Sequence, residues 1–171
     1  MMAVHPPLPA LACIFIYTAL LLRLSWIDLR QRLLPDYLNY SLLWSGLLFH
    51  VFISPDRLAS AVTGAVVGYL SLWTLFWCYF FFRKCEGIGY GDMKLLAALG
   101  AWHGWQSLPW IVLIAAICGL AMAGIIKFWR AGSGGLFTTP LPFGPCLAIA
   151  GGVTGWFNHY PFKLNDFNWL L

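Results

Sequence analysis

The stretch LASAVTGAVVGYLSLWTLFWCYFFF, residues 58–82, contains no Asp, Glu, Lys or Arg. A helix needs roughly 20 consecutive apolar residues to cross the hydrocarbon core of a bilayer. Residues 58–82 are therefore long enough and apolar enough to form a transmembrane helix. Gly64 and Gly68, on one side of this helix, give it a face of small residues against which another helix can pack closely.

Other uncharged stretches run through most of the 171 residues, at positions 1–22, 37–55, 95–126 and 131–162. The third of these is too long for one span, and WHGWQSLP at 102–109 indicates a turn inside it. We therefore expect helices over residues 6–27, 37–53, 58–82, 92–105, 109–129 and 143–158. The sequence predicts one all-α membrane domain over residues 1–171, a polytopic protein with about six transmembrane helices.

Composition supports a lipid environment and excludes several classes of protein. Hydrophobic residues make up 61% of the chain and charged residues only 9%, whereas an ordinary soluble domain has about 25% charged residues. The ten basic residues form no cluster or stripe, so we expect no nucleic-acid partner. The five cysteines include no C-x-x-C pair, and we expect no metal site. Several tryptophans near helix ends are expected to be interfacial anchors: Trp26, Trp102, Trp105, Trp110 and Trp129.

The basic residues also predict the topology, because cytoplasmic loops carry an excess of Lys and Arg. The helix at 92–105 is the doubtful span, since its 14 residues rise only about 21 Å. If it spans and the N-terminus is outside, eight basic residues face the cytoplasm and two face outward. If it is re-entrant, the division is seven to three. The charge distribution favours six spans, with loops 28–36, 83–92 and 130–142 in the cytoplasm.

Two aspartates are expected at the same boundary of the membrane. Asp28 follows the first helix and Asp92 begins the fourth. Ionisable groups at membrane depth are costly and often mark a functional site. A simpler alternative is that Asp92, and Asp36 after Pro35, are helix N-caps. Three glycines at alternating positions before Asp92 exceed what a cap needs, and they would allow close approach of an extended substrate.

These residues carry a resemblance to a known family. Gly89-Tyr90-Gly91-Asp92, followed by Lys94, matches the G-x-G-D motif of the type IV prepilin peptidases, which are membrane-embedded aspartic proteases. Asp28 with Pro35-Asp36 resembles the first aspartate motif of that family. The proline-rich element before its last helix is similar to Leu141-Pro142-Phe143-Gly144-Pro145. The three motifs occur in the family's order.

The resemblance implies roles for these residues. Asp28 and Asp92 would be the catalytic pair. Supporting positions would be Gly89, Gly91, Lys94, Pro35 and Asp36, and a weaker role in shaping the substrate cleft would fall to Pro142, Phe143, Gly144 and Pro145. Lys94 would either tune the pair or act only as one of the cytoplasmic positive charges.

The resemblance also implies an activity and a location. The substrate would be a type IV prepilin or pseudopilin-like precursor, cut after its leader peptide at a glycine on the cytoplasmic boundary of the bacterial inner membrane. The product would serve a type IV pilus or protein secretion. Many members carry an insert with two C-x-x-C pairs and also N-methylate the trimmed pilin. This sequence contains no such insert, so it resembles a short form, and we expect no methyltransferase activity and no cofactor.

Paired carboxyls would supply the chemistry. Two neighbouring carboxyls cannot both ionise readily, so one remains protonated at neutral pH. The ionised one takes a proton from water, and the protonated one hydrogen-bonds the scissile carbonyl. No metal is required for this reaction.

Other functions fit less well. A serine protease using Ser133 would need a nearby histidine, and all four histidines fall at the opposite ends of the predicted helices. A metalloprotease would need H-E-x-x-H, but Glu86, the only glutamate, has no histidine near it. A small transporter would show midplane charges or a two-fold repeat, which this sequence lacks. A non-catalytic membrane assembly subunit would leave the paired aspartates unexplained.

Overall fold

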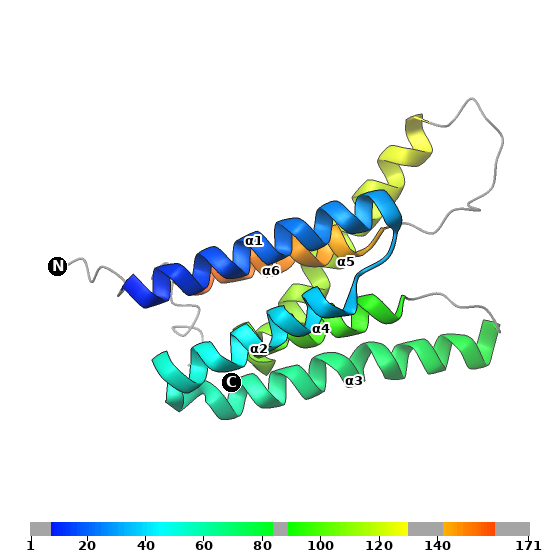
Figure 1. Ribbon diagram of the computed structural model, residues 1–171. Helices are drawn as coiled ribbons and strands as arrows, with labels where there is room; N and C mark the ends of the chain where they lie inside the picture. The colour runs from blue at the N-terminus through cyan, green and yellow to red at the C-terminus, as the bar shows by residue number, and fades with distance from the viewer. Residues whose placement is uncertain (1–7, 84–88, 130–141, 160–171) are drawn as a thin grey trace, which may run out of the picture.

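The computed structural model describes residues 8–83, 89–129 and 142–159 (Figure 1). The described residues form helices and contain no strand, which confirms the all-α class. The helices are α1 (Leu8–Gln31), α2 (Asp36–Ile53), α3 (Leu58–Arg83), α4 (Tyr90–His103), α5 (Leu108–Trp129) and α6 (Gly144–His159). Short 3-10 turns at Pro55–Arg57 and Trp105–Ser107 precede α3 and α5. Each helix lies within a few residues of its expected range.

Helix α1 is the element whose end differs most from the prediction. It continues to Gln31 instead of ending at residue 27, so Asp28 lies inside its last turn. The helix stops at Arg32, which has a positive φ of 53° and whose N–H donates to the Asp28 carbonyl at 2.8 Å. Glycine usually takes this left-handed conformation at the end of a helix, but here Arg32 takes it and its hydrogen bond closes α1.

Three of the helical stretches are long and apolar enough to cross a bilayer: Ala12–Gln31, Pro55–Phe82 and Trp105–Phe128. Large apolar side chains along them are exposed, as lipid-facing residues are in a membrane protein. Phe15 is 74% exposed, Phe81 81% and Leu120 77%. The chain is therefore a polytopic membrane protein.

The shortest of the six α-helices, α4, is the one best covered by protein. It packs against α2, α3, α5 and α6. Every residue from Leu95 to Ala101 is buried, as is Met93. A helix that is apolar on all sides belongs inside a protein or a membrane. Because its neighbours enclose α4, its length need not match the thickness of the lipid.

The predicted face of small residues on α3 packs against α4, as a glycine face should. Gly64 meets Gly100 so closely that a Cβ on either residue would overlap the backbone of the other. A Cβ on Gly68 would lie 2.8 Å from the Leu96 carbonyl oxygen. The two helices thus touch backbone to backbone, which requires glycine at the contact.

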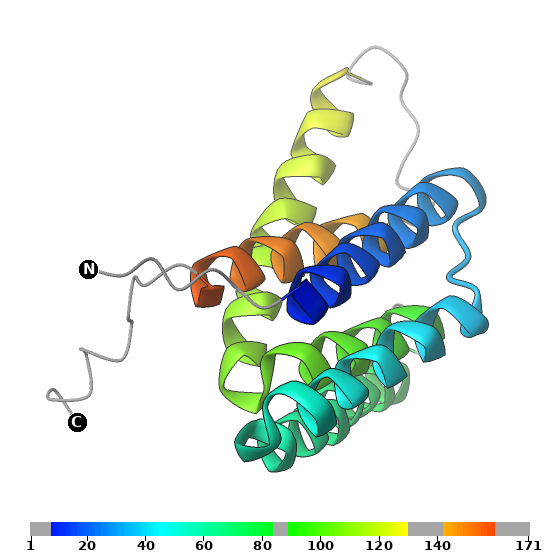
Figure 2. The same cartoon turned by 60° about the vertical axis from the view of Figure 1, so that its left-hand side comes forward.

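The helix termini that carry the motif residues meet at one end of the bundle (Figure 1). The last turn of α1 lies there, with the first turns of α2, α4 and α6. Helices α1 and α6 run side by side, whereas the second half of α5 diverges from the others (Figure 2). In that half of α5, Phe128 is 83% exposed.

Trp102, expected as an interfacial anchor, instead packs into the protein at the opposite end of α4. Its indole Nε1 donates to the Leu42 carbonyl at 2.9 Å, and its ring stacks on Phe49. Tyr17 packs against the same ring and hydrogen-bonds His103 Nε2 at 2.9 Å. Trp26, Trp105 and Trp110 are all more than half exposed, as anchors would be.

Candidate active site

Asp28 is a buried carboxyl with one backbone donor. Asp28 is 5% exposed, and its Oδ2 accepts a hydrogen bond of 3.0 Å from the backbone N–H of Gly144. Gly144 is the first residue of α6. The first N–H groups of a helix have no partner within the helix, so this carboxyl satisfies one of them. A Cβ on Gly144 would lie 2.7 Å from Asp28 Oδ2. Glycine at 144 therefore allows α6 to begin directly against the carboxyl.

Asp92 lies in the first turn of α4 and is half-buried. The N-cap of α4 is Gly89, whose carbonyl accepts the Asp92 N–H at 3.1 Å. Asp92 is therefore not the N-cap residue that the simpler alternative expects, although its carboxyl accepts a backbone hydrogen bond from Gly89. Asp36 is not an N-cap residue either, because Pro35 occupies the N-cap position of α2 and Asp36 is its first helical residue.

The structure brings Asp28 and Asp92 together, although they are far apart in the sequence. The two carboxyls lie close enough to interact electrostatically. Asp28 lies in the last turn of α1 and Asp92 in the first turn of α4, and these two helix ends lie at the same end of the bundle (Figure 1). This is the arrangement expected from the two motifs.

Leu34 packs between the first turn of α4, which carries Asp92, and the start of α6, which donates to Asp28. It lies in the link between α1 and α2, next to Gly91 on one side and Gly144 on the other. A Cβ on Gly91 would lie 2.7 Å from Leu34 Cβ and 3.1 Å from its Cδ1. A Cβ on Gly144 would lie 3.3 Å from Leu34 Cδ2. The close approach that explains Gly91 is thus to this chain's own leucine, where the sequence suggested a substrate.

Gly89 has a different neighbour, the carboxyl of Asp92 itself. A Cβ on Gly89 would lie 3.3 Å from Asp92 Oδ2. Each described glycine of the G-x-G-D motif therefore leaves room for one particular side chain. Gly87, the first of the three alternating glycines, and Glu86 lie outside the described residues.

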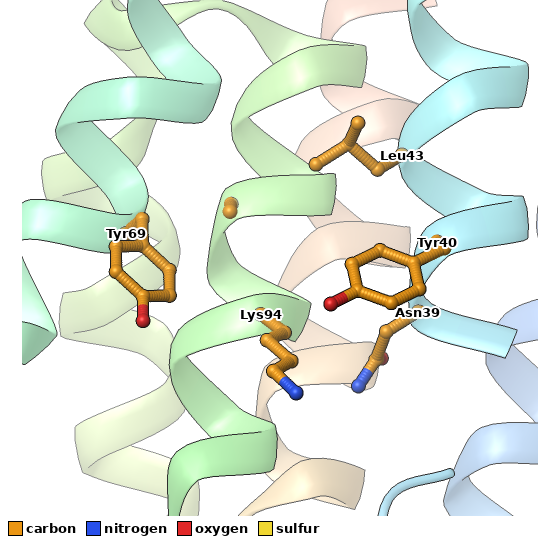
Figure 3. Close-up of a pocket in the computed structure, with 6 residues that line it drawn as sticks. Asn39, Tyr40, Leu43, Tyr69 and Lys94 are labelled. Atoms are coloured by element: carbon orange, nitrogen blue, oxygen red, sulfur yellow. The ribbon is translucent and has the colours of Figure 1, made fainter. Parts of the chain in front are cut away.

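Lys94 forms an ion pair with Asp36 and not with Asp28 or Asp92. Its Nζ lies 2.6 Å from Asp36 Oδ1, and the two side chains are 26% and 57% exposed. Lys94 also lines a pocket of about 240 Å³ between α2, α3 and α4, together with Asn39, Tyr40 and Tyr69 (Figure 3). The sequence did not predict this ion pair. Lys94 is in α4 and Asp36 is in α2, and the pairing depends on how the two helices pack.

Asn39 is a buried polar residue that the motifs do not include. Its side chain is 1% exposed, and Nδ2 lies 3.5 Å from the Gly91 carbonyl oxygen, a long hydrogen bond. Its Oδ1 has no hydrogen-bond partner among the described residues. The only sequence signal for this position was an asparagine near the start of a largely apolar helix.

The proline-rich element divides its contacts between Asp28 and α5. Gly144 contacts Asp28 as described, whereas the Phe143 ring faces Gly119 of α5, whose Cβ would lie 3.5 Å from it. The Phe143 carbonyl accepts the Leu147 N–H at 3.1 Å, and Pro145 is buried. Leu141 and the serine loop around Ser133 lie outside the described residues.

Comparison with known proteins identifies the family of this chain. The profile of the Type IV leader peptidase family matches residues 15–124, a range that includes both aspartates. The chain belongs to this family. The resemblance to the family is thereby confirmed, although the proline-rich motif at 141–145 lies beyond the matched range.

The relatives of this chain fall into two groups by length. The chain is 47% identical, over 95% of its residues, to the prepilin leader peptidase/N-methyltransferase of Burkholderia pseudomallei (strain K96243), and it covers 52% of that protein. It is 43% identical to the leader peptidase HopD of Salmonella typhimurium, over 89% of this chain and 97% of HopD. The HopD of Escherichia coli is 46% identical, with 84% and 91% covered. The chain thus spans about half the length of the relatives named peptidase/N-methyltransferase. No solved structure matches the chain.

Proposed function

We propose that this chain is an intramembrane aspartic endopeptidase that removes the leader peptide from type IV prepilin or pseudopilin-like precursors. The observation that carries the proposal is the meeting of two carboxyls, Asp28 and Asp92, at one end of a membrane-embedded bundle. Membership of the leader peptidase family and the names of the relatives point to the same substrate class.

The geometry supports a reaction in which the two carboxyls share one proton. Two negative charges close together and shielded from water repel strongly, so the pair holds a proton at neutral pH. The ionised carboxyl accepts a proton from water as the water attacks the scissile carbonyl carbon. The protonated carboxyl donates a hydrogen bond to the carbonyl oxygen, which gains negative charge in the tetrahedral intermediate. Collapse of that intermediate breaks the C–N bond, and the amine leaves with a proton from the pair.

The surroundings of Asp28 fit this role. Its hydrogen bond from Gly144 holds one oxygen in place, and burial excludes bulk water from that side. A carboxyl whose orientation is held in advance loses little freedom during the reaction. A membrane assembly subunit or a transporter gives no reason to keep Asp28 buried beside a second carboxyl.

We place the aspartate end of the bundle at the cytoplasmic face of the inner membrane. The basic residues support this orientation, since eight of the ten fall on that side when all six helices span. The substrate would then meet the pair where its leader peptide joins its own membrane helix.

A cleavage assay with purified chain tests the proposed function. The protein, in detergent or liposomes, is incubated with a prepilin-like precursor, and mass spectrometry of the products identifies the bond that is cut. We expect one cut on the N-terminal side of the hydrophobic segment. Release of no peptide by folded protein, with precursors from several pilus and secretion systems, would refute the proposal.

A further inference from the structure

A groove with a polar end and an apolar end lies between α2 and α3, over α4. Its polar end is a hollow of about 240 Å³, where Figure 3 shows Lys94 between the rings of Tyr40 and Tyr69. Its apolar end is a hollow of about 360 Å³ that shares Tyr69, Leu43 and Ala97 with the first. The other residues that line the apolar end are all aliphatic: Ala65, Val66 and Leu70. Neither of the paired aspartates lines the groove, so it is separate from the proposed active site.

An ion pair at the polar end of the groove lies beside an apolar surface. Lys94 and Asp36 are both partly exposed, and Lys94 lies one turn inside α4 from its first residue, Tyr90. The ring of Phe76 in α3 contacts that of Tyr90, and α3 continues past this point. In this extension Phe81 is 81% exposed. The lipid-facing surface therefore extends beyond the ion pair. Charged groups at such a depth need polar partners, because hydrocarbon supplies no hydrogen bonds.

The ion pair can bind one further group of each charge. The Lys94 ammonium has three N–H donors, and its one hydrogen bond among the described residues goes to Asp36 Oδ1. The other carboxylate oxygen, Oδ2, accepts no hydrogen bond from that part of the chain. A simple anion would be attracted by Lys94 but repelled by Asp36, and a simple cation would meet the reverse. A molecule that carries both charges close together would be attracted by both residues.

We propose that this groove binds one phospholipid whose headgroup carries a phosphate and a primary ammonium, as in phosphatidylethanolamine. The phosphate accepts N–H groups of Lys94, the ammonium donates to Asp36 Oδ2, and one acyl chain occupies the apolar end. A hollow of about 360 Å³ suits an acyl chain better than another protein helix, which is about 10–12 Å across. The lipid site does not depend on the proposed peptidase function, because it uses neither Asp28 nor Asp92.

Headgroup selectivity tests this site. The purified protein, stripped of lipid in detergent, is mixed with phosphatidylethanolamine, phosphatidylglycerol or phosphatidylcholine that carry the same acyl chains. Native mass spectrometry then measures the Kd of the first bound lipid. We expect phosphatidylethanolamine to bind about three- to fivefold more tightly than either other lipid, near the upper end for a partly exposed ion pair. Phosphatidylglycerol lacks the ammonium, and the methylated ammonium of phosphatidylcholine has no N–H to donate.

Substitutions at the two ends of the groove should have different effects. Asp36→Asn should remove the preference for phosphatidylethanolamine, whereas Lys94→Met should weaken the binding of all three lipids, because each carries a phosphate. Ala65→Leu fills the apolar end and should weaken all three about tenfold or more, since displacing two buried methylenes alone accounts for about that factor. The matched controls make the same changes outside the groove and should bind as the unsubstituted protein does: Asp56→Asn, Lys127→Met and Ala121→Leu.

Two results would overturn the proposal. If phosphatidylglycerol binds as tightly as phosphatidylethanolamine, the ion pair does not select a headgroup that carries both charges. If Ala65→Leu binds each lipid as the unsubstituted protein does, the lipid lies elsewhere on the apolar surface. Should Ala65→Leu fail to fold, as its melting temperature would show, the Kd measured for Ala65→Val decides.

Discussion

Replacing Asp28 with Asn removes a charge from the proposed pair but preserves the shape of the side chain. Asn Oδ1 can still accept the 3.0 Å hydrogen bond from Gly144. A hydrogen bond to a charged group contributes about 1.5–3 kcal/mol and one between neutral groups about 0.5–1.5. We therefore expect Asp28→Asn to lose about 1–1.5 kcal/mol of stability. Asp28→Ala leaves the buried Gly144 N–H unpaired, which costs about 1–3 kcal/mol.

The effect on cleavage should be much larger than the effect on folding. Proton transfer by a positioned side chain contributes about 10²–10⁴-fold to a rate, so Asp28→Asn and Asp92→Asn should each lower kcat/KM at least about 100-fold. Since the two carboxyls act as a unit, the double variant should be little slower than either single one.

The assay measures precursor cleavage in liposomes, with the melting temperature of each variant as the check on folding. Asp36→Asn is the matched control, because Asp36 lies at the same end of the bundle but its side chain is 57% exposed and pairs with Lys94. It should cleave at close to the unchanged rate. A folded Asp28→Asn protein that keeps more than about a tenth of the activity, against the loss expected for a proton-transfer residue, would refute the paired mechanism. An inactive Asp36→Asn protein beside an active Asp28→Asn one would move the first aspartate to position 36.

Three further predictions concern packing, the exposed ion pair and topology. Gly100→Ala should destabilise the protein by about 1–3 kcal/mol, because the added Cβ would overlap the backbone of α3. Gly124→Ala is the control and should not destabilise it, because no atom lies within 4 Å of where its Cβ would be. Thermal unfolding of the two variants measures the difference. Lys94→Met should change stability by less than about 1 kcal/mol, since its pair with Asp36 is partly exposed; a larger loss in the same measurement would contradict this. A cysteine at position 133, Ser133→Cys, should react with a membrane-impermeant thiol reagent only from the cytoplasmic side; labelling from outside would invert α5 and α6.

Much of the fold was predictable because helix formation in a membrane protein is a local property. Long uncharged runs, glycine pairs and turn residues placed all six helices within a few residues of their observed bounds. The end of α1 was the largest error. Nothing in its composition shows that Arg32 takes a left-handed conformation, since glycine usually occupies that position. The family was recognisable for the same reason, because each of its motifs is a run of neighbouring residues.

The contacts of the site were decided only by tertiary structure. Sequence reasoning placed Asp28 and Asp92 at one boundary, but it did not show that α6 donates an N–H to Asp28. It also did not show that Leu34 explains Gly91, or that Lys94 belongs to Asp36. Apolar runs and motifs determine which helices form and which residue types they carry. Which side chains meet depends on how those helices pack against one another, and each contact here joins segments that are remote in the chain.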